Sequence, residues 1–231
     1  MKLVDAALQG TGIYSIPEAA RYARINAKTL RSWFGTAGSN RAKLYREEIE
    51  STGMKVLSFF ELIEALAVRS LRTDHGVSLQ RIRQALETAN ERYGIHHLFA
   101  RKEHKTVLIG SDIYIFFGDD TQSPVQLTGK HRGQKSFKEC IEMYMQDLDF
   151  DAVGLAKVYT AFRFKGEEVI LNPKLHFGDP VMKRSGYTAN TLYSAAVAEG
   201  SLVKAAHLYD VSETEVEAAY RYCSTELSLA A

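Results

Sequence analysis

The stretch SIPEAARYARINAKTLRSWF, residues 15–34, decides the fold of the amino-terminal part of this 231-residue chain. Ser15 and Glu18 have the spacing of a capping box, in which the serine accepts from an early helical amide and the glutamate reaches back, so a helix should begin there. Arg24-Ile25-Asn26 predicts a turn, and Asn26 can cap a second helix over Ala27–Phe34. Two short helices joined in this way form a helix-turn-helix, the unit that reads DNA.

The second helix has the chemistry of a recognition helix, with Lys28 and Arg31 at i and i+3 on one face. Arginine reads guanine with two hydrogen bonds and lysine adds a salt-dependent phosphate contact, so we expect specificity from Arg31 and affinity from Lys28. The predicted DNA-binding residues are Ser15, Arg24, Lys28, Thr29, Arg31, Ser32, Arg41, Lys43 and Arg46. A solvated charged face is the alternative, because the glutamates that follow Arg46 could pair with the last three. Trp33, on the opposite side, is expected in the core.

A second stretch, Ser201–Ala219, repeats the packing positions of the first 186 residues later, with other charges. Residues 14–46 hold seven Lys and Arg against one Glu, a net charge of +6, whereas 199–231 holds two basic and six acidic residues, a net charge of −4. Glu213, Glu215 and Glu217 would repel phosphate, so this unit is expected to bind protein. The predicted partner-binding residues are Tyr187, Tyr193, Tyr209, Glu213, Glu217 and Tyr220, since tyrosine is enriched in interface cores. A purely structural helical domain is the alternative.

The whole chain predicts an α+β fold that is mostly α. Gly35–Val56 suits a hairpin wing, and capping residues with apolar periodicity predict helices after Ser58, Ser78 and Thr188. Gly94 is expected to end the helix after Ser78, and further helix stops are expected at Gly200 and Asp210. In the tail, Ser212 and Glu215 form a further capping box. Aromatic and β-branched runs predict a hairpin or small sheet in 98–127 and short strands over 153–164, 169–171 and 180–183. The expected parts are a winged helix-turn-helix at 1–95, a β-rich middle at 96–165 and a helical tail with a second helix-turn-helix at 166–231.

Cysteine usage and hydropathy indicate a cytoplasmic protein. Cys140 and Cys223 are the only cysteines, too few for a disulfide framework. The sequence contains neither a leader pattern nor a run of roughly 18 apolar residues without charge, so a membrane span is not expected.

Catalytic and metal sites are also disfavoured, and we expect a protein that is not an enzyme and needs no cofactor. Asp147, Asp149 and Asp151 could face a cation if extended, but a solvated turn that ends a preceding helix is the favoured interpretation. Histidines 96, 97 and 104 lack the spacing of a zinc motif, and 129–133 lacks that of a phosphate loop. No nucleophile is paired with a base in the sequence.

Two parts of the chain resemble known families. The stretches Tyr14-Ser-Ile-Pro-Glu-Ala-Ala20, Thr29-Leu-Arg-Ser-Trp33 and Leu71–Leu79 resemble the winged-helix DNA-binding domain of MerR-type regulators over residues 14–93. The tail, through Val169–Pro173, Phe177-Gly-Asp-Pro180 and Val216-Glu-Ala-Ala219, is similar to domain-of-unknown-function family 433. It departs from that family after Pro180, where Val-Met-Lys-Arg-Ser-Gly replaces the usual glycine-threonine-arginine.

This order of parts resembles a subgroup of VapB-type antitoxins. The resemblance implies a homodimer that binds double-stranded operator DNA, represses its own operon and neutralises a PIN-type ribonuclease toxin by direct binding. One alternative is a MerR-like regulator whose middle part holds a small ligand among Tyr114, Phe116 and Phe117. Another is an adaptor without a DNA role, whose basic head binds an acidic protein.

Overall fold

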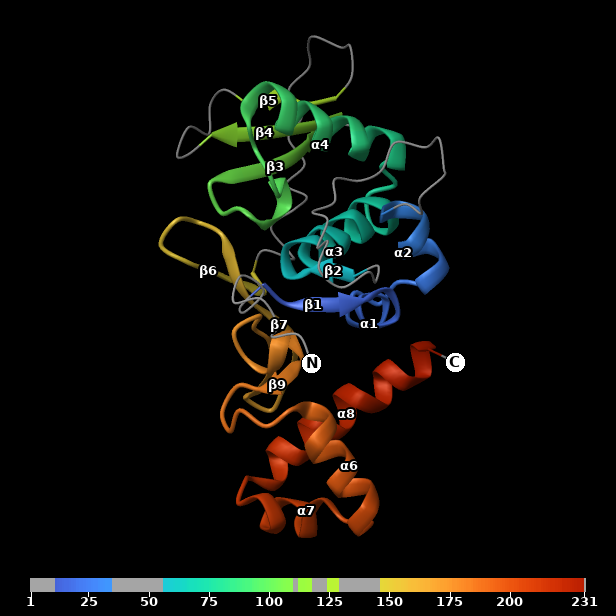
Figure 1. The fold of residues 1–231 in the computed structure, drawn as a ribbon, viewed down its shortest axis with the longest axis vertical. Helices are drawn as coiled ribbons and strands as arrows, with labels where there is room; N and C mark the ends of the chain where they lie inside the picture. Colours follow the sequence, from blue (N-terminus) through green and yellow to red (C-terminus); the bar gives the residue numbers. More distant parts are fainter. Residues whose placement is uncertain (1–10, 35–55, 110–111, 118–123, 129–145, 231) are drawn as a thin grey trace, which may run out of the picture.

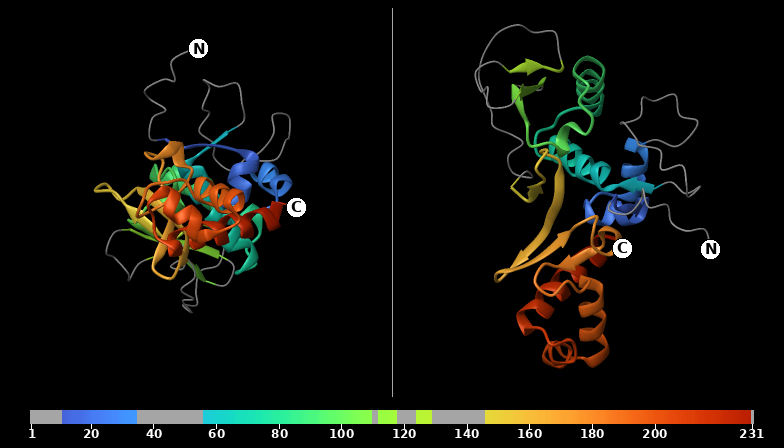
Figure 2. Two further views of the ribbon diagram at one scale, coloured as in Figure 1. Left: turned by 90° about the horizontal axis from the view of Figure 1, so that it is seen from below. Right: turned by 60° about the vertical axis from the view of Figure 1, so that its left-hand side comes forward.

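The computed structural model describes residues 11–34, 56–109, 112–117, 124–128 and 146–230. The fold is mixed α/β, with helices and small antiparallel sheets. In Figure 1 the amino-terminal head and the β-rich middle lie at one end and the helical tail at the other. The sheet formed by residues 148–182 lies between them, as the right-hand view of Figure 2 shows.

The head begins with β1 (Ile13–Ser15), which continues directly into α1 (Ile16–Tyr22), followed by α2 (Ala27–Phe34). The predicted capping box is present, with the Glu18 amide donating to Ser15 Oγ at 3.4 Å and the Ser15 amide donating to Glu18 Oε2 at 2.8 Å. Strand β2 (Val56–Ser58) pairs antiparallel with β1. This pairing was not predicted, because three-residue strands show too little alternation to detect. The predicted wing, Gly35–Val56, lies outside the described residues except for Val56, which begins β2.

Two long helices complete the head and confirm the capping signals. Helix α3 (Phe59–Thr73) begins at a second capping box, formed by Ser58 and Glu61, and α4 (Leu79–Tyr93) is capped by Ser78. Ten of the fifteen residues of α3 are buried, and its apolar side chains share one core with α1, α2 and the middle part. Gly94 ends α4 in the left-handed conformation, as its position in the sequence predicted.

The middle part is a three-stranded sheet of β3 (His104–Ile109), β4 (Asp112–Phe117) and β5 (Val125–Gln126), preceded by the short helix η3 (Leu98–Ala100). Strands β3 and β4 form the predicted antiparallel hairpin. An ion pair between Arg81 and Asp112, 2.9 Å long, fixes α4 to the first residue of β4. The sheet therefore belongs to the same packed body as the head.

A second sheet has the order β6–β7–β8–β9, built from β6 (Leu148–Phe150), β7 (Ala156–Phe164), β8 (Glu167–Leu171) and β9 (Pro180–Met182). The strands predicted over 153–164, 169–171 and 180–183 are confirmed. The expected solvated turn around Leu148 is wrong, because this segment pairs with β7 as an edge strand. The boundary expected at 165/166 falls in the turn that joins β7 to β8.

The tail consists of α6 (Ala189–Glu199), α7 (Leu202–Tyr209) and α8 (Glu213–Ala230). Thr188 caps α6, Gly200 ends it and Asp210 ends α7, both in the left-handed conformation, as the stop signals predicted. These helices share a small core with the sheet through Val169 and Met182. The tail is thus packed on β8 and β9 instead of being joined by a free linker.

A short helix, η4 (His176–Gly178), lies between β8 and β9 and contacts β1 of the head. The buried Tyr14 hydroxyl of β1 donates to the Gly178 carbonyl oxygen at 3.1 Å. Burial raises the pKa of Tyr14 far above its ordinary value, so its hydroxyl stays protonated and remains a donor. A Cβ atom on Gly178 would overlap that hydroxyl, and the glycine has a φ of +96°.

We expect Gly178→Ala to cost about 3 kcal/mol of unfolding free energy, since it adds overlap with Tyr14 to the strain of positive φ. Gly186→Ala is the matched control, because Gly186 has a φ of +79° but open space around its Cβ position. The control should cost only about 1 kcal/mol. Urea unfolding of both variants measures the difference, and equal costs would contradict the packing role of Gly178.

Candidate functional site

The head and the tail each contain two helices joined by a short turn, and the two turns have the same local geometry. In the head, Arg24 adopts φ +53° and the Ile25 amide donates to the Ala20 carbonyl oxygen at 2.8 Å. In the tail, Asp210 adopts φ +52° and the Val211 amide donates to the Ala206 carbonyl oxygen at 3.0 Å. Each of these positions is displaced by 186 residues, the offset that the sequence indicated.

The second helix of the head presents a basic surface and a buried apolar one. Leu30, Trp33 and Phe34 are buried, which confirms the expectation that the tryptophan packs into the core. The opposite side of α2 is exposed and carries Lys28, Thr29, Arg31 and Ser32. The helix is held from behind, where Arg83 of α4 donates to the Ser32 carbonyl oxygen at 3.5 Å. This arrangement leaves the predicted recognition surface open to solvent.

The other predicted DNA-binding residues lie in different settings. Ser15 is the cap of α1, with its side chain accepting from the Glu18 amide. Arg24 is exposed in the turn, and Arg69 of α3 supports that turn by donating to the Ala23 carbonyl oxygen at 2.9 Å. Within the described part of the chain, neither Arg24 nor the basic residues of α2 form an ion pair. The predicted residues Arg41, Lys43 and Arg46 lie outside the described residues.

The acidic residues of the tail unit do not share one environment. Glu213 is exposed at the start of α8, whereas Glu217 forms ion pairs with Lys165 at 3.1 Å and Arg221 at 2.8 Å. Hydrogen bonds from Arg221 and then Lys165 lower the pKa of Glu217. Glu217 is therefore neutralised within the chain. Its ion pair with Lys165 links α8 to the turn between β7 and β8.

Only half of the expected capping box at the start of α8 is present. The Glu215 amide donates to Ser212 Oγ at 3.1 Å, as predicted. The Glu215 carboxylate, however, accepts from the Ser185 amide at 3.1 Å and is 1% exposed. The side chain turns away from its own helix because the loop after β9 offers it a buried backbone donor.

The predicted partner-binding tyrosines form two contacting pairs on the tail. Tyr187 meets Tyr209 edge to face with ring centroids 5.1 Å apart, and Tyr193 meets Tyr220 at 5.3 Å. Tyr187 and Tyr220 are each 39% exposed, so each pair presents part of its surface to solvent. The tail also exposes apolar residues that sequence reasoning missed, namely Val197, Val203 and Leu208.

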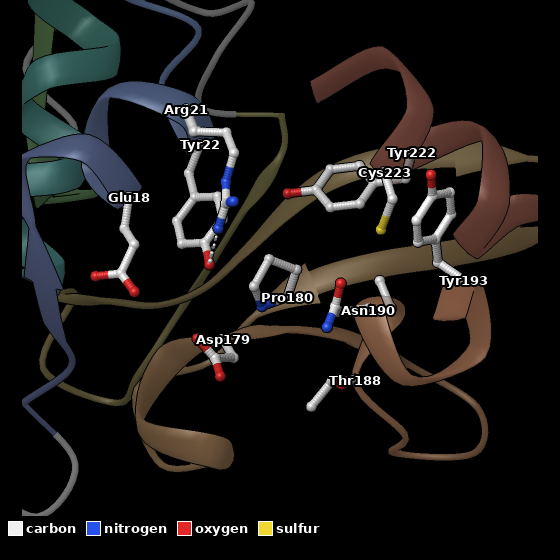
Figure 3. A pocket seen from close by; sticks show the side chains of 11 residues that line it. Glu18, Arg21, Tyr22, Asp179, Pro180, Thr188, Asn190, Tyr193, Tyr222 and Cys223 are labelled. Atoms are coloured by element: carbon white, nitrogen blue, oxygen red, sulfur yellow. Dashed lines mark hydrogen bonds between the residues drawn. The ribbon is translucent and has the colours of Figure 1, made fainter. Parts of the chain in front are cut away.

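The structure brings α1 of the head against the tail and leaves a cavity of about 290 Å³ between them, here called the junction cleft. Figure 3 shows its lining: Glu18, Arg21, Tyr22, Asp179, Pro180, Thr188, Ala189, Asn190, Tyr193, Tyr222 and Cys223. Partial burial, and then the nearby Glu18 carboxylate, raise the pKa of Asp179. No sequence signal could have found this site, because its two walls are about 160 residues apart in the chain.

Three of the residues weighed as metal ligands, Asp147, Asp151 and His97, make contacts within the fold. Asp147 binds Arg163 across β6 and β7, and the Asp151 carboxylate accepts from the amides of Val153 and Leu155. His97 stacks on Phe60 with centroids 4.9 Å apart. Among the described residues, no three His, Cys, Asp or Glu side chains gather in a metal-binding arrangement, nor has any helix the length and hydropathy to cross a bilayer.

Two of the three residues expected to hold a ligand in the middle part, Tyr114 and Phe116, are at least partly buried, and the side chain of Phe117 lies outside the described residues. Phe116 is 4% exposed, and Tyr114 is partly buried on β4 opposite Val107. The junction cleft is lined by other residues. The middle sheet is thus a packed structural unit in the part of the chain that the structure describes.

Comparison with known proteins adds to this geometry. No family profile matches the chain. Over 190 residues it is 27% identical to a Mycobacterium tuberculosis protein named "Putative antitoxin VapB45", with 75% of this chain and 78% of that protein covered. The crystal structure of Rv2018 from the same organism superposes with a TM-score of 0.63 at 20% identity, over 89% of this chain and 96% of Rv2018. The chain has the Rv2018 fold.

Asp179→Asn is expected to raise the unfolding free energy at pH 7. Because folding raises the pKa of Asp179, its ionised form is less favourable in the folded chain. The penalty is absent below the unfolded value of about 3.9, where both states are protonated, and grows as the pH rises through the folded pKa.

Urea unfolding between about pH 4 and pH 8 measures this effect. Asp149→Asn, at an exposed position on β6, is the control and should show no such gain. A gain for Asp179→Asn that does not grow with pH would contradict the electrostatic explanation.

Proposed function

We propose that this chain is the antitoxin of a type II toxin–antitoxin pair, as the resemblance to VapB-type antitoxins implies. The observation that carries the proposal is the alignment with the protein named as antitoxin VapB45, which covers 75% of this chain and includes more than one of its parts. Such a protein has a regulatory role, is not an enzyme, acts in the cytoplasm and needs no cofactor.

In this proposal the head binds operator DNA. Its support is the exposed basic side of α2, held on a buried side formed by Leu30, Trp33 and Phe34. Two copies related by a twofold axis would place two such helices in successive major grooves of a palindromic operator, and binding there represses the operon. The head would be MerR-like.

The tail and the middle would bind the toxin, a PIN-type ribonuclease. The support is the contrast between the two units, since the tail has a net charge of −4 and exposes tyrosines and aliphatic residues. Aromatic residues of this kind contribute much of the binding energy in protein interfaces. The tail would then be the family-433-like module.

Gel-shift titration with the DNA upstream of the gene tests the first half. Lys28→Ala and Arg31→Ala should each weaken binding by about tenfold or more, since each removes a charge-assisted contact. Lys204→Ala removes an exposed lysine from the corresponding unit of the tail and should leave the affinity unchanged. Binding of the native chain should fall steeply with salt. Unchanged affinity in both α2 variants would remove the DNA-binding role from the head.

Co-expression with the protein encoded beside it tests the second half. We expect a stable complex, and Tyr187→Ala or Tyr220→Ala should weaken it by about tenfold or more in a titration. Tyr93→Ala, which removes a comparably exposed tyrosine from the head, is the control and should retain the native affinity. Failure of the native chain to bind its neighbour would count against the antitoxin proposal.

A further inference from the structure

The charged side chains of the junction cleft favour the binding of a single cation. Its lining contains two carboxylates, Glu18 and Asp179, and one guanidinium, Arg21. The guanidinium is already engaged, since its Nη2 donates to the Tyr22 hydroxyl at 3.2 Å. The Glu18 carboxylate repels Asp179, whereas His176, Arg21 and a hydrogen bond from the Tyr22 hydroxyl stabilise the Asp179 carboxylate, and neither carboxylate forms a close ion pair with a described residue. The lining of the cleft therefore has one more carboxylate than guanidinium groups.

The walls of the cleft suit a flat group. Tyr22 comes from α1, Tyr222 from α8 and Tyr193 from α6, and Figure 3 shows the Tyr222 ring extending across the cleft towards Tyr22. Pro180 lies between these walls. One cation–π contact is already present in the cleft, because the Arg21 guanidinium lies over the Tyr22 ring with its Cζ atom 5.1 Å from the ring centroid. Aromatic faces attract cations at such distances.

Size and polarity restrict the ligand further. A volume of about 290 Å³ is at the lower end of ligand-binding cavities and fits one ring with a short substituent. The exposed side chain of Asn190 points into the cleft and can orient a ligand by donating or accepting. A large ligand would not fit this volume, and a polyanionic ligand would be repelled by the two carboxylates.

We propose that the junction cleft binds a small organic monocation with a flat unsaturated body, such as an amidine, a guanidine or an aromatic amine. Its cationic nitrogen donates to Glu18 and Asp179 while its flat body lies among Tyr22, Tyr193 and Tyr222. The site is separate from the exposed side of α2, and it meets the tyrosines of the tail at Tyr193, whose ring also contacts Tyr220. Because it has one wall on α1 and the other on the tail, a bound ligand connects the two parts.

Benzamidine and benzamide test the site directly on the purified full chain. The two molecules have nearly the same shape, but only benzamidine is charged at pH 8. Benzamidine is expected to bind in calorimetric titration and to raise the melting temperature, with benzamide at least about tenfold weaker. Asp179→Asn should reduce benzamidine affinity by at least about tenfold.

Two further variants make the result decisive. Glu18→Gln keeps the capping box, since glutamine can still accept from the Ser15 amide, and should also lose at least about tenfold. Glu213→Gln removes an exposed carboxylate from α8 outside the cleft and should stay within about twofold of the native chain. The proposal is overturned if benzamide binds as well as benzamidine, if neither binds at about 10 mM, or if Glu213→Gln loses as much as the cleft variants.

Discussion

A buried hydrogen bond from the Tyr14 hydroxyl to the Gly178 carbonyl oxygen joins two residues that are 164 positions apart. Loss of the donor would leave a buried carbonyl oxygen unsatisfied, which costs about 1–3 kcal/mol. The contact requires a glycine at 178, because any side chain there would occupy the space of the hydroxyl. The orientation of α1 towards the tail, and with it the junction cleft, depends on this close approach.

The two helix pairs, α1–α2 in the head and α7–α8 in the tail, show how one backbone geometry can support different surfaces. Both place a left-handed residue at the turn and close it with the same type of backbone hydrogen bond. In the head, the second helix leaves its cations exposed and unpaired with any described acidic residue. In the tail, the second helix directs Glu215 and Glu217 to partners within the chain. The geometry is therefore compatible with DNA binding, but the side chains decide whether it is used for that purpose.

The sheet of β6–β9 determines how these units relate to each other. Its strand β7 contributes Ala156 to the core of the head and middle, while β8 and β9 contribute Val169 and Met182 to the core of the tail. A ligand or partner that contacts both units therefore binds two parts that are already packed on the same sheet. A flexible linker would not transmit such contacts, whereas packed elements resist relative movement.

The sequence by itself determined the local structure of this protein. Capping residues such as Ser15, Ser58 and Thr188, together with the stops at Gly94 and Gly200, gave the helix limits, because caps and left-handed turns depend on neighbouring residues only. Helical periodicity also predicted that the basic side of α2 is exposed and that Trp33 is buried, because it too depends only on nearby residues.

Tertiary structure alone decided the contacts between distant segments. The pairing of β1 with β2, the strand at Leu148, the inward turn of Glu215 and the junction cleft all depend on partners far away in the chain. Long-range partners of this kind leave no local pattern, since a hydrogen bond or a cavity wall is specified by where two segments meet and not by what precedes or follows each of them.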